Sequence, residues 1–306
     1  MSLMMQSRHV LLAFVVAAAW GFNFVVIQVG LGAFPPLLLV ALRFAVAALP
    51  ALVLTRPPLP WSQLVVLGMV WFAGQFVLLF TGMKAGMPPG LASVCMQSQA
   101  FLTILFAAIA LGERPRARQL AGIVVAALGI VAIGTTASGH TADITPLGLC
   151  LVLMGAASWA LGNVMTRRLP RTDMLALVAW LSLVPPVPLL ALSVSFEGPT
   201  AIWSALSGMT WHGIGAVLYL AVVATTLGFG VWGHLLSLYP AGVVAPFSLL
   251  VPVFGVLASA IVVGEGFPPL RLTGMGLILL GLAVIVLPLP ALAGGRAGAG
   301  TGPSRG

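Results

Sequence analysis

Acidic side chains are scarce in this sequence. Five Asp and Glu residues stand against 13 Lys and Arg residues among 306. The five are Glu113, Asp143, Asp173, Glu197 and Glu265, and each falls at the edge of a long apolar run or between two such runs. Carboxylates inside apolar spans are the usual proton relays of membrane proteins. The sequence therefore lacks the residues that a carboxylate relay needs.

Residues typical of catalytic and metal sites are also few. The sequence has two cysteines, Cys95 and Cys150, and four scattered histidines, with no His-Glu-x-x-His and no Asp pair. We expect no metal and no cofactor, and an intramembrane enzyme is a distant alternative because it would need such groups inside the bilayer. The two cysteines can be packing residues or a disulfide pair, and packing is the more common role in apolar surroundings.

Long apolar runs dominate the chain. Sixty per cent of the residues are hydrophobic and 6% are charged, and the mean hydropathy is +1.16. About 20 apolar residues are needed to cross a bilayer, and their backbone groups must be satisfied internally, which favours helices. Ten such runs predict an all-α polytopic membrane protein. They are Val10–Val29, Pro35–Leu54, Leu64–Met83, Leu91–Leu111, Leu120–Thr136, Pro146–Met165, Met174–Val194, Gly213–Leu236, Gly242–Val263 and Leu272–Leu289.

The positive charges are distributed unevenly between the two ends of these spans. With the N-terminus inside, the inner face receives ten arginines, whereas the outer face receives Lys84 and Arg271. Such a bias orients membrane proteins, with the cationic loops in the cytoplasm. The net charge of +8 therefore predicts contact with anionic lipid headgroups rather than nucleic acid. Both termini are expected in the cytoplasm. The ten inner-face residues are Arg8, Arg56, Arg114, Arg116, Arg118, Arg167, Arg168, Arg171, Arg296 and Arg305.

One pattern occurs twice, 152 residues apart. Gly112-Glu113, Gly122 and Gly129 recur as Gly264-Glu265, Gly274 and Gly281, and Gly90 falls on Gly242. The glutamates matter most because acids are so rare here. A duplicated membrane unit is typical of transporters, in which two related halves rock around one site. The paired glycines, seven residues apart, form small-residue faces that are expected to pack helices closely.

Five spans in each copy place the copies in opposite orientations. We expect a first five-helix repeat over residues 8–136 and a second, inverted one over 146–290, arranged around a central cavity. The loop Ala137–Thr145 separates them, and residues 291–306 form a Gly- and Ala-rich tail expected to be a flexible cytoplasmic end. Glu113 is then predicted inside and Glu265 outside. The oligomeric state is left open.

Specific residues give these repeats a family resemblance. Leu111-Gly112-Glu113 and Val263-Gly264-Glu265 each close a fourth span, and the other matching stretches are Trp20-Gly21-Phe22-Asn23, Leu42-Arg43-Phe44 and Ser158-Trp159-Ala160-Leu161-Gly162-Asn163. Together they resemble the EamA-type exporters of the drug/metabolite transporter superfamily, and YddG-like amino-acid exporters are the nearest group. The resemblance covers residues 8–290. It implies ten helices around a cavity and outward movement of small metabolites across, most simply, a bacterial inner membrane.

The polar residues inside the spans limit the substrate. Phosphorylated anions would need several cations deep in the spans, and only Arg43 lies deep. Cationic drugs would need an acid inside a span, and the sequence has none there. A neutral or zwitterionic amino acid fits best, and a multidrug or other metabolite carrier is the alternative. Without a carboxylate relay, we expect facilitated export or exchange rather than proton antiport. A channel is less favoured because of the repeats.

Substrate-binding residues can be proposed on the first helices of the two repeats and on the fourth span. Trp20 and Asn23 correspond to Trp159 and Asn163, and these four could form a wall of the cavity, although caps and interfacial anchors compete with that interpretation. Gln97 and Gln99 are costly if they face lipid. They are two residues apart, so one is expected to line the cavity, or both could join helices.

The remaining predictions concern a buried charge, an aromatic stripe and a histidine. Burying Arg43 costs several kcal/mol unless it is paired, so a helix C-terminus, carbonyl groups or a substrate carboxylate is expected beside it. Phe76 and Phe80, with Phe72, form a stripe that either packs or lines the site, alongside Gln75. His234 could couple a proton but is more often neutral and hydrogen-bonded.

Overall fold

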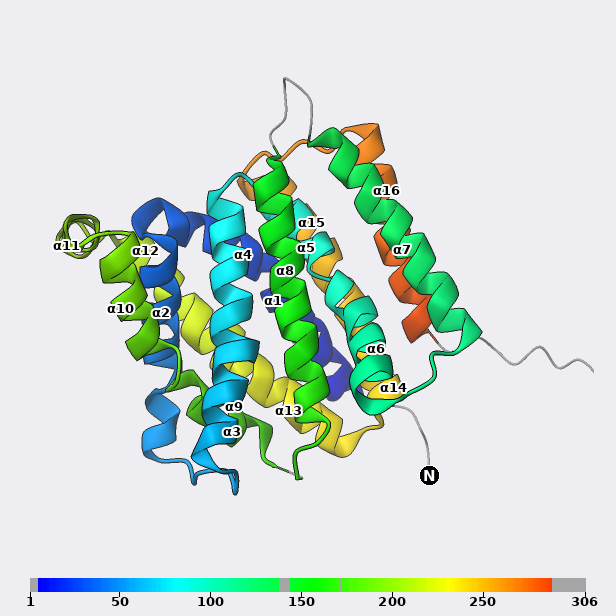
Figure 1. Ribbon diagram of the computed structural model, residues 1–306, viewed down its shortest axis with the longest axis horizontal. Coiled ribbons are helices and arrows are strands. Elements are labelled where there is room, and N and C mark those ends of the chain that lie inside the picture. Colours follow the sequence, from blue (N-terminus) through cyan, green and yellow to red (C-terminus); the bar gives the residue numbers. More distant parts are fainter. Residues whose placement is uncertain (1–4, 138–143, 171, 288–306) are drawn as a thin grey trace, which may run out of the picture.

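The computed structural model describes residues 5–137, 144–170 and 172–287. Within these ranges the chain is a bundle of helices without a β-strand (Figure 1). Short π-helical and 3-10 stretches, labelled η, interrupt several of them. The elements are α1 (Ser7–Ala33), α2 (Pro36–Ala47), η1 (Leu49–Leu52), α3 (Trp61–Leu67), η2 (Gly68–Gly74), α4 (Gln75–Lys84), α5 (Pro89–Cys95), α6 (Ser98–Leu111), α7 (Ala117–Thr136), α8 (Pro146–Thr166), α9 (Met174–Ser182), α10 (Pro186–Phe196), α11 (Pro199–Ser207), α12 (Trp211–Leu218), η3 (Tyr219–Leu227), α13 (Gly228–Leu238), α14 (Ala241–Val244), η4 (Ala245–Leu249), α15 (Leu250–Val262) and α16 (Pro269–Val286).

Nine helical stretches among the described residues are long and apolar enough to cross a membrane. The tenth predicted span, Pro35–Leu54, corresponds to the shorter apolar helix Pro36–Leu52. A polytopic all-helical membrane protein is thus confirmed, and the count of ten spans stays a prediction. The nine stretches are Ser7–Ala33, Trp61–Lys84, Pro89–Leu111, Ala117–Thr136, Pro146–Thr166, Met174–Phe196, Trp211–Leu238, Ala241–Val262 and Pro269–Val286.

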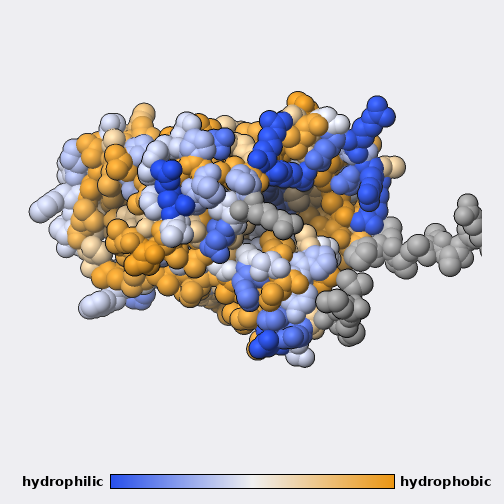
Figure 2. All heavy atoms as spheres, turned by 90° about the horizontal axis from the view of Figure 1, so that it is seen from below, coloured by the Kyte–Doolittle hydropathy of each residue, from blue (hydrophilic) through white to orange (hydrophobic). Residues whose placement is uncertain are grey.

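One end of the bundle is hydrophilic, and its flanks are apolar (Figure 2). We call the end at which α1 begins, at the bottom of Figure 1, the lower end, and the opposite one the upper end. Viewed from below, hydrophilic side chains gather on the lower end, while hydrophobic atoms cover the flanks (Figure 2). Many large apolar side chains are exposed, and Ile109 and Ile261 are 83% and 81% exposed. In water such a surface would be unstable, whereas lipid tails solvate it.

Helices α7 and α16 pack face to face through the predicted glycines. A methyl group added at Gly122 would collide with the backbone of Gly281, and one added at Gly129 would collide with Gly274. The reciprocal collisions hold for Gly274 and Gly281. Dispersion forces between closely approaching backbones hold helices together where lipid removes the hydrophobic drive. The packing role predicted for this repeated glycine pattern is confirmed.

Two π-helical stretches lie in the middle of long spans. They are η2, within Trp61–Lys84, and η3, within Trp211–Leu238. A π-bulge leaves carbonyl groups without their usual helical donors, and such bulges are frequent at functional sites. Side chains from other helices fill this need: Ser158 Oγ donates to Val70 O at 2.6 Å, and Trp20 Nε1 donates to Ala224 O at 2.8 Å.

Two further spans are broken near their middle. One is Pro89–Leu111, in which α5 ends at Cys95 and α6 begins at Ser98. The other is Ala241–Val262, in which the 3-10 stretch η4 separates α14 from α15. Pro246 lies at the start of η4 and cannot donate a backbone hydrogen bond. Broken helices of this kind commonly surround the binding site of a transporter.

Several other predictions concern loops and cysteines. Cys95 is buried and Cys150 is exposed, and both are free thiols, so no disulfide joins them. The connection between α10 and α12 contains the short helix α11, and Trp203 and Trp211 are 73% and 84% exposed. Residues 138–143, 171 and 288–306, including the tail 291–306, lie outside the described residues, so those predictions are not tested.

Candidate functional site

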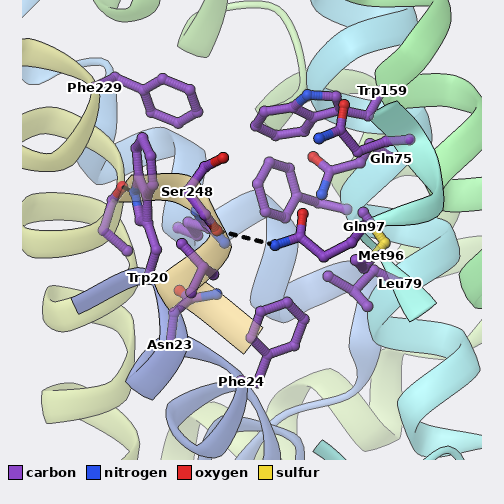
Figure 3. A pocket seen from close by; sticks show the side chains of 15 residues that line it. Trp20, Asn23, Phe24, Gln75, Leu79, Met96, Gln97, Trp159, Phe229 and Ser248 are labelled. Atoms are coloured by element: carbon purple, nitrogen blue, oxygen red, sulfur yellow. Dashed lines mark hydrogen bonds between the residues drawn. The ribbon is translucent and has the colours of Figure 1, made fainter. Parts of the chain in front are cut away.

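A cavity of about 150 Å³ lies among the interrupted helices. One water molecule needs about 10–15 Å³ of such a cavity, so the volume has room for several waters or a small metabolite. In Figure 3, Trp20, Phe229 and Ser248 approach from one side, and Gln75, Gln97 and Trp159 from the other. The lining residues are Trp20, Asn23, Phe24, Arg43, Gln75, Phe76, Leu79, Met96, Gln97, Gln99, Trp159, Ala224, Phe229, Ser248 and Val251.

Arg43 of α2 is the cation in this lining, and it is 2% exposed. Its Nε and Nη2 donate to Thr225 Oγ1 at 3.1 and 2.9 Å, and its Cζ lies 3.9 Å from the centroid of the Phe76 ring. A cation is attracted to the face of an aromatic ring, most strongly when water is absent. The partners expected from the sequence were carbonyls, a helix C-terminus or a substrate. A hydroxyl group was not foreseen.

The π-helical stretch η3 explains how Thr225 is placed beside Arg43. The Thr225 hydroxyl donates to Leu220 O at 2.7 Å, five residues earlier, and Thr226 makes the same bond to Ala221 O at 3.1 Å. These hydroxyls satisfy carbonyl groups that the π geometry frees. With its proton directed at Leu220 O, the Thr225 oxygen presents its lone pairs to the guanidinium group.

Three polar atoms around the cavity are buried without a hydrogen-bond partner among the described residues. They are Arg43 Nη1, Asn23 Oδ1 and Gln75 Oε1. Leaving such a group unpaired costs about 1–3 kcal/mol, and more for a charged one. The cavity therefore offers one donor on a cation and two neutral acceptors to a bound molecule. A cationic donor can bind a carboxylate, and neutral amide oxygens can accept from an ammonium group.

Aromatic rings cover the rest of the cavity. Trp159 and Phe229 stack with centroids 5.8 Å apart and planes at 26°, and the Trp20 ring lies 5.4 Å from Phe229. Trp20 is fixed by its hydrogen bond to Ala224 O. Apolar walls with a few placed polar groups are typical of small-molecule sites.

Both Gln97 and Gln99 line the cavity, whereas one had been expected. The expectation assumed a continuous helix, in which residues two apart point to different faces. The break between α5 and α6 removes that constraint. Gln97 Nε2 donates to the backbone oxygen of Ser248 at 3.2 Å, and Gln99 Oε1 accepts from Asn163 Nδ2 at 3.0 Å. The break therefore turns both amides toward the interior.

Three predicted site residues lie outside the lining. Phe80 is buried beside Phe76, with centroids 6.0 Å apart. Asn163 is joined to Gln99 and is not itself a lining residue. His234 is exposed near the lower end, where its ring lies 6.2 Å from that of His9. The reason in each case is the rotation and depth of the helix, which sequence spacing alone does not give.

Other lining residues were not foreseen from the sequence: Phe24, Leu79, Met96, Ala224, Phe229, Ser248 and Val251. Ser248 lies 152 residues after Met96, so the repeat relates two of these residues to each other without indicating either. The remaining members are apolar and resemble packing residues in sequence. Among the described residues no group of His, Cys, Asp and Glu is suited to hold a metal ion, and no lining residue is acidic.

Comparisons with known proteins give consistent results. The profile of the EamA-like transporter family matches residues 7–135 and again residues 146–287. A Salmonella typhimurium protein named "Probable amino-acid metabolite efflux pump" is 42% identical over 287 residues, covering 92% of this chain and 96% of its own. An Escherichia coli protein of the same name is 39% identical over 291 residues, covering 93% and 97%. These similarities are to transporters, not to enzymes.

More distant similarities extend over most of the chain as well. The Escherichia coli "Uncharacterized inner membrane transporter YedA" is 27% identical over 277 residues, covering 88% of this chain and 87% of its own. A solved structure titled "Crystal structure of protein" superposes with a TM-score of 0.61 at 23% identity, covering 92% of this chain and 97% of that one. The latter establishes a shared fold.

Proposed function

Because the chain belongs to the EamA-like transporter family, we propose that it exports small zwitterionic metabolites, above all neutral amino acids, by alternating access. The central cavity is the binding site in this proposal. The names of the two relatives at 42% and 39% identity agree with such a substrate.

The observation that carries the proposal is the set of unpaired polar atoms around the cavity. Arg43 Nη1 is free to donate to a carboxylate, and Asn23 Oδ1 and Gln75 Oε1 are free to accept from an ammonium group. A zwitterion carries both kinds of group that these atoms lack, an anionic acceptor for the guanidinium and a cationic donor for the amide oxygens. The rings of Trp20, Trp159 and Phe229 then contact the rest of the substrate.

Export in this proposal is facilitated or by exchange. The lining of the cavity contains no carboxylate. A proton-coupled carrier would need a group near the site that changes charge between its two states, and carboxylates are the usual choice within a membrane. Arg43 supplies a fixed positive charge for the substrate carboxylate, and the group that accepts its hydrogen bonds in the protein is the neutral hydroxyl of Thr225.

The architecture proposed from the sequence, ten spans in two inverted repeats, has support in paired features. The two π-helical stretches and the two broken spans each fall about 152 residues apart, and Gly122 and Gly129 of α7 meet Gly281 and Gly274 of α16 in the opposite order. The lower end, rich in arginine, is taken as cytoplasmic by the positive-inside rule. The membrane is taken as a bacterial inner membrane, and both termini as cytoplasmic.

Transport into liposomes tests the function. Purified protein is reconstituted, loaded with one unlabelled amino acid and supplied with labelled amino acids outside, with phosphorylated sugars and a cationic dye as other substrates. We expect saturable counterflow of neutral amino acids without an imposed pH gradient. Counterflow of the dye alone would point to a multidrug carrier. Uptake only with a pH gradient would refute facilitated transport.

A further inference from the structure

Glu265 joins the upper ends of the two broken spans. Its Oε2 accepts from Gly90 N at 2.7 Å, and its Oε1 accepts from Leu91 N at 3.1 Å. The Ser259 hydroxyl donates to the same carboxylate. The first backbone N–H groups of a helical span have no internal acceptor, and an anion there is favoured by the helix dipole. One carboxylate thus holds Pro89–Leu111 against Ala241–Val262.

The fit around this contact is tight. A methyl group added at Gly90 would collide with Glu265 Oε2, the Phe267 ring and Ser259. One added at Gly255, further along the same pair of spans, would collide with Ser93. The upper halves of the two broken spans are therefore in close contact, and that contact lies above the cavity.

The corresponding groups at the lower end are apart. The 152-residue repeat relates Glu113 to Glu265 and Gly242 to Gly90. Glu113 is exposed and accepts from Arg167 Nη1 at 2.9 and 3.0 Å. A methyl group added at Gly242 would meet nothing within 4 Å, and Val243 N donates to Pro240 O at 2.9 Å rather than to a carboxylate. The two copies of one motif are thus in different states.

We propose that Glu265 and Glu113 are positioning residues for transport that act as alternate latches. In the conformation described here Glu265 holds the upper end closed. When the protein switches, Glu265 releases Gly90 and Leu91, and Glu113 leaves Arg167 to bind the N–H groups of Gly242 and Val243. The inference rests on the proposed alternating access, but not on the identity of the substrate.

The present partner of Glu113 makes this exchange feasible. Both side chains of the Glu113–Arg167 pair are about half exposed (51% and 44%), and solvent-exposed ion pairs contribute little to stability. Glu113 can therefore change partners at small cost. Glu265, by contrast, accepts from two backbone N–H groups and a hydroxyl, which are charge-assisted bonds of the stronger kind.

Glu197 provides a matched control. Its carboxylate accepts from Leu37 N at 2.7 Å and Leu38 N at 3.2 Å, and from the Ser193 hydroxyl at 2.6 Å. The chemistry is the same as that of Glu265, but the contact joins α2 to α10 and has no partner motif 152 residues away. Removing its charge should lower the stability of the protein without favouring either conformation.

Spin-label distances in liposomes without substrate test the latches. In full-length protein with Cys95 and Cys150 changed to alanine, one label pair on Pro88→Cys and Gly266→Cys reports the upper end. A second pair on Arg114→Cys and Ala241→Cys reports the lower end. Each pair is measured with Glu265→Gln, Glu265→Asp, Glu113→Gln and Glu197→Gln.

We expect Glu265→Gln to shift the ratio of upper-open to upper-closed molecules roughly tenfold, since two backbone donors lose a charged acceptor. The lower pair should shorten in the same molecules. Glu265→Asp should restore part of the closed population, Glu113→Gln should deplete the lower-closed state, and Glu197→Gln should leave both ratios unchanged. Equal ratios in wild type, Glu265→Gln and Glu113→Gln would overturn the proposal, as would an equal shift in Glu197→Gln.

The same preparations separate this inference from the proposed function. Counterflow of amino acids is measured on each variant. If the distances respond as expected and no amino acid is carried, the latches stand and the substrate assignment fails. If amino acids are carried and the distances do not respond, the substrate assignment stands and the latches fail.

Discussion

Replacing Arg43 tests the proposed binding site most directly. Two of its nitrogens are occupied by Thr225, and its Nη1 has no partner among the described residues. A hydrogen bond to a charged group contributes about 1.5–3 kcal/mol. Arg43→Gln should therefore raise the KM for a neutral amino acid by roughly 10- to 150-fold, since each 1.4 kcal/mol is a factor of ten.

A structural role for Arg43 would also lower transport, so the assay needs a second substrate. The amide of the same amino acid keeps the ammonium group and side chain but lacks the carboxylate. If Arg43 Nη1 binds the carboxylate, Arg43→Gln should weaken transport of the amino acid far more than transport of its amide. Counterflow in liposomes gives both KM values, and the pair forms a double-mutant cycle.

Two variants refine the comparison. Arg43→Lys keeps the charge but has a single nitrogen, so it cannot bond Thr225 twice and a carboxylate as well. It should fall between wild type and Arg43→Gln. Thr225→Val removes the acceptor that orients the guanidinium group, and it should weaken amino-acid transport without abolishing it. Equal losses for the amino acid and its amide in Arg43→Gln would refute carboxylate binding by Arg43.

Three further predictions follow from the packing and from the cavity wall. Gly281→Ala should destabilise the protein by about 1–3 kcal/mol through overpacking against α7. Gly276→Ala should not, because a methyl group added there meets nothing within 4 Å. Melting temperatures of the two variants in detergent test this, and equal values would contradict the close packing. Trp159→Ala should raise the KM for amino acids with large apolar side chains roughly tenfold and for glycine less, since a buried aromatic face contributes about 1.5–3 kcal/mol when fully covered. A uniform loss for all substrates would argue against its role as a wall. Gln99→Ala removes one of the two acceptors of Asn163 Nδ2 and leaves Thr103 Oγ1, and it should lower the rate of counterflow several-fold, as about 1 kcal/mol is lost with one hydrogen bond. Unchanged export in this variant would remove Gln99 from the site.

The sequence was most informative where burial has a high physical cost. Arg43, Gln97 and Gln99 could be placed in the interior because a charge or amide facing lipid is expensive. The glycines of α7 and α16 could be placed at a helix contact because their spacing repeats and lipid favours small residues there. In both cases the type of residue and the lipid around the helices were enough for the inference.

Prediction was weaker where partners come from distant positions. Thr225 lies 182 residues from Arg43, and its orientation depends on a π-helical stretch that no residue pattern announced. Ser248 contributes a backbone oxygen to Gln97, so its side chain carries no signal of the contact. His234 was expected in the site because histidine titrates near neutral pH, but chemistry alone does not give the depth of a residue in the bundle.

The repeat also sets a limit on what sequence can show. Gly112-Glu113 and Gly264-Glu265 are the same motif, and the sequence distinguishes them only by the side of the membrane predicted for each. In the structure one glutamate holds two backbone N–H groups and the other holds an exposed arginine. A carrier that opens its cavity to one side at a time keeps at least one of its two ends closed in every state. The difference between Glu265 and Glu113 is therefore a property of the conformation, and it should reverse when the conformation does.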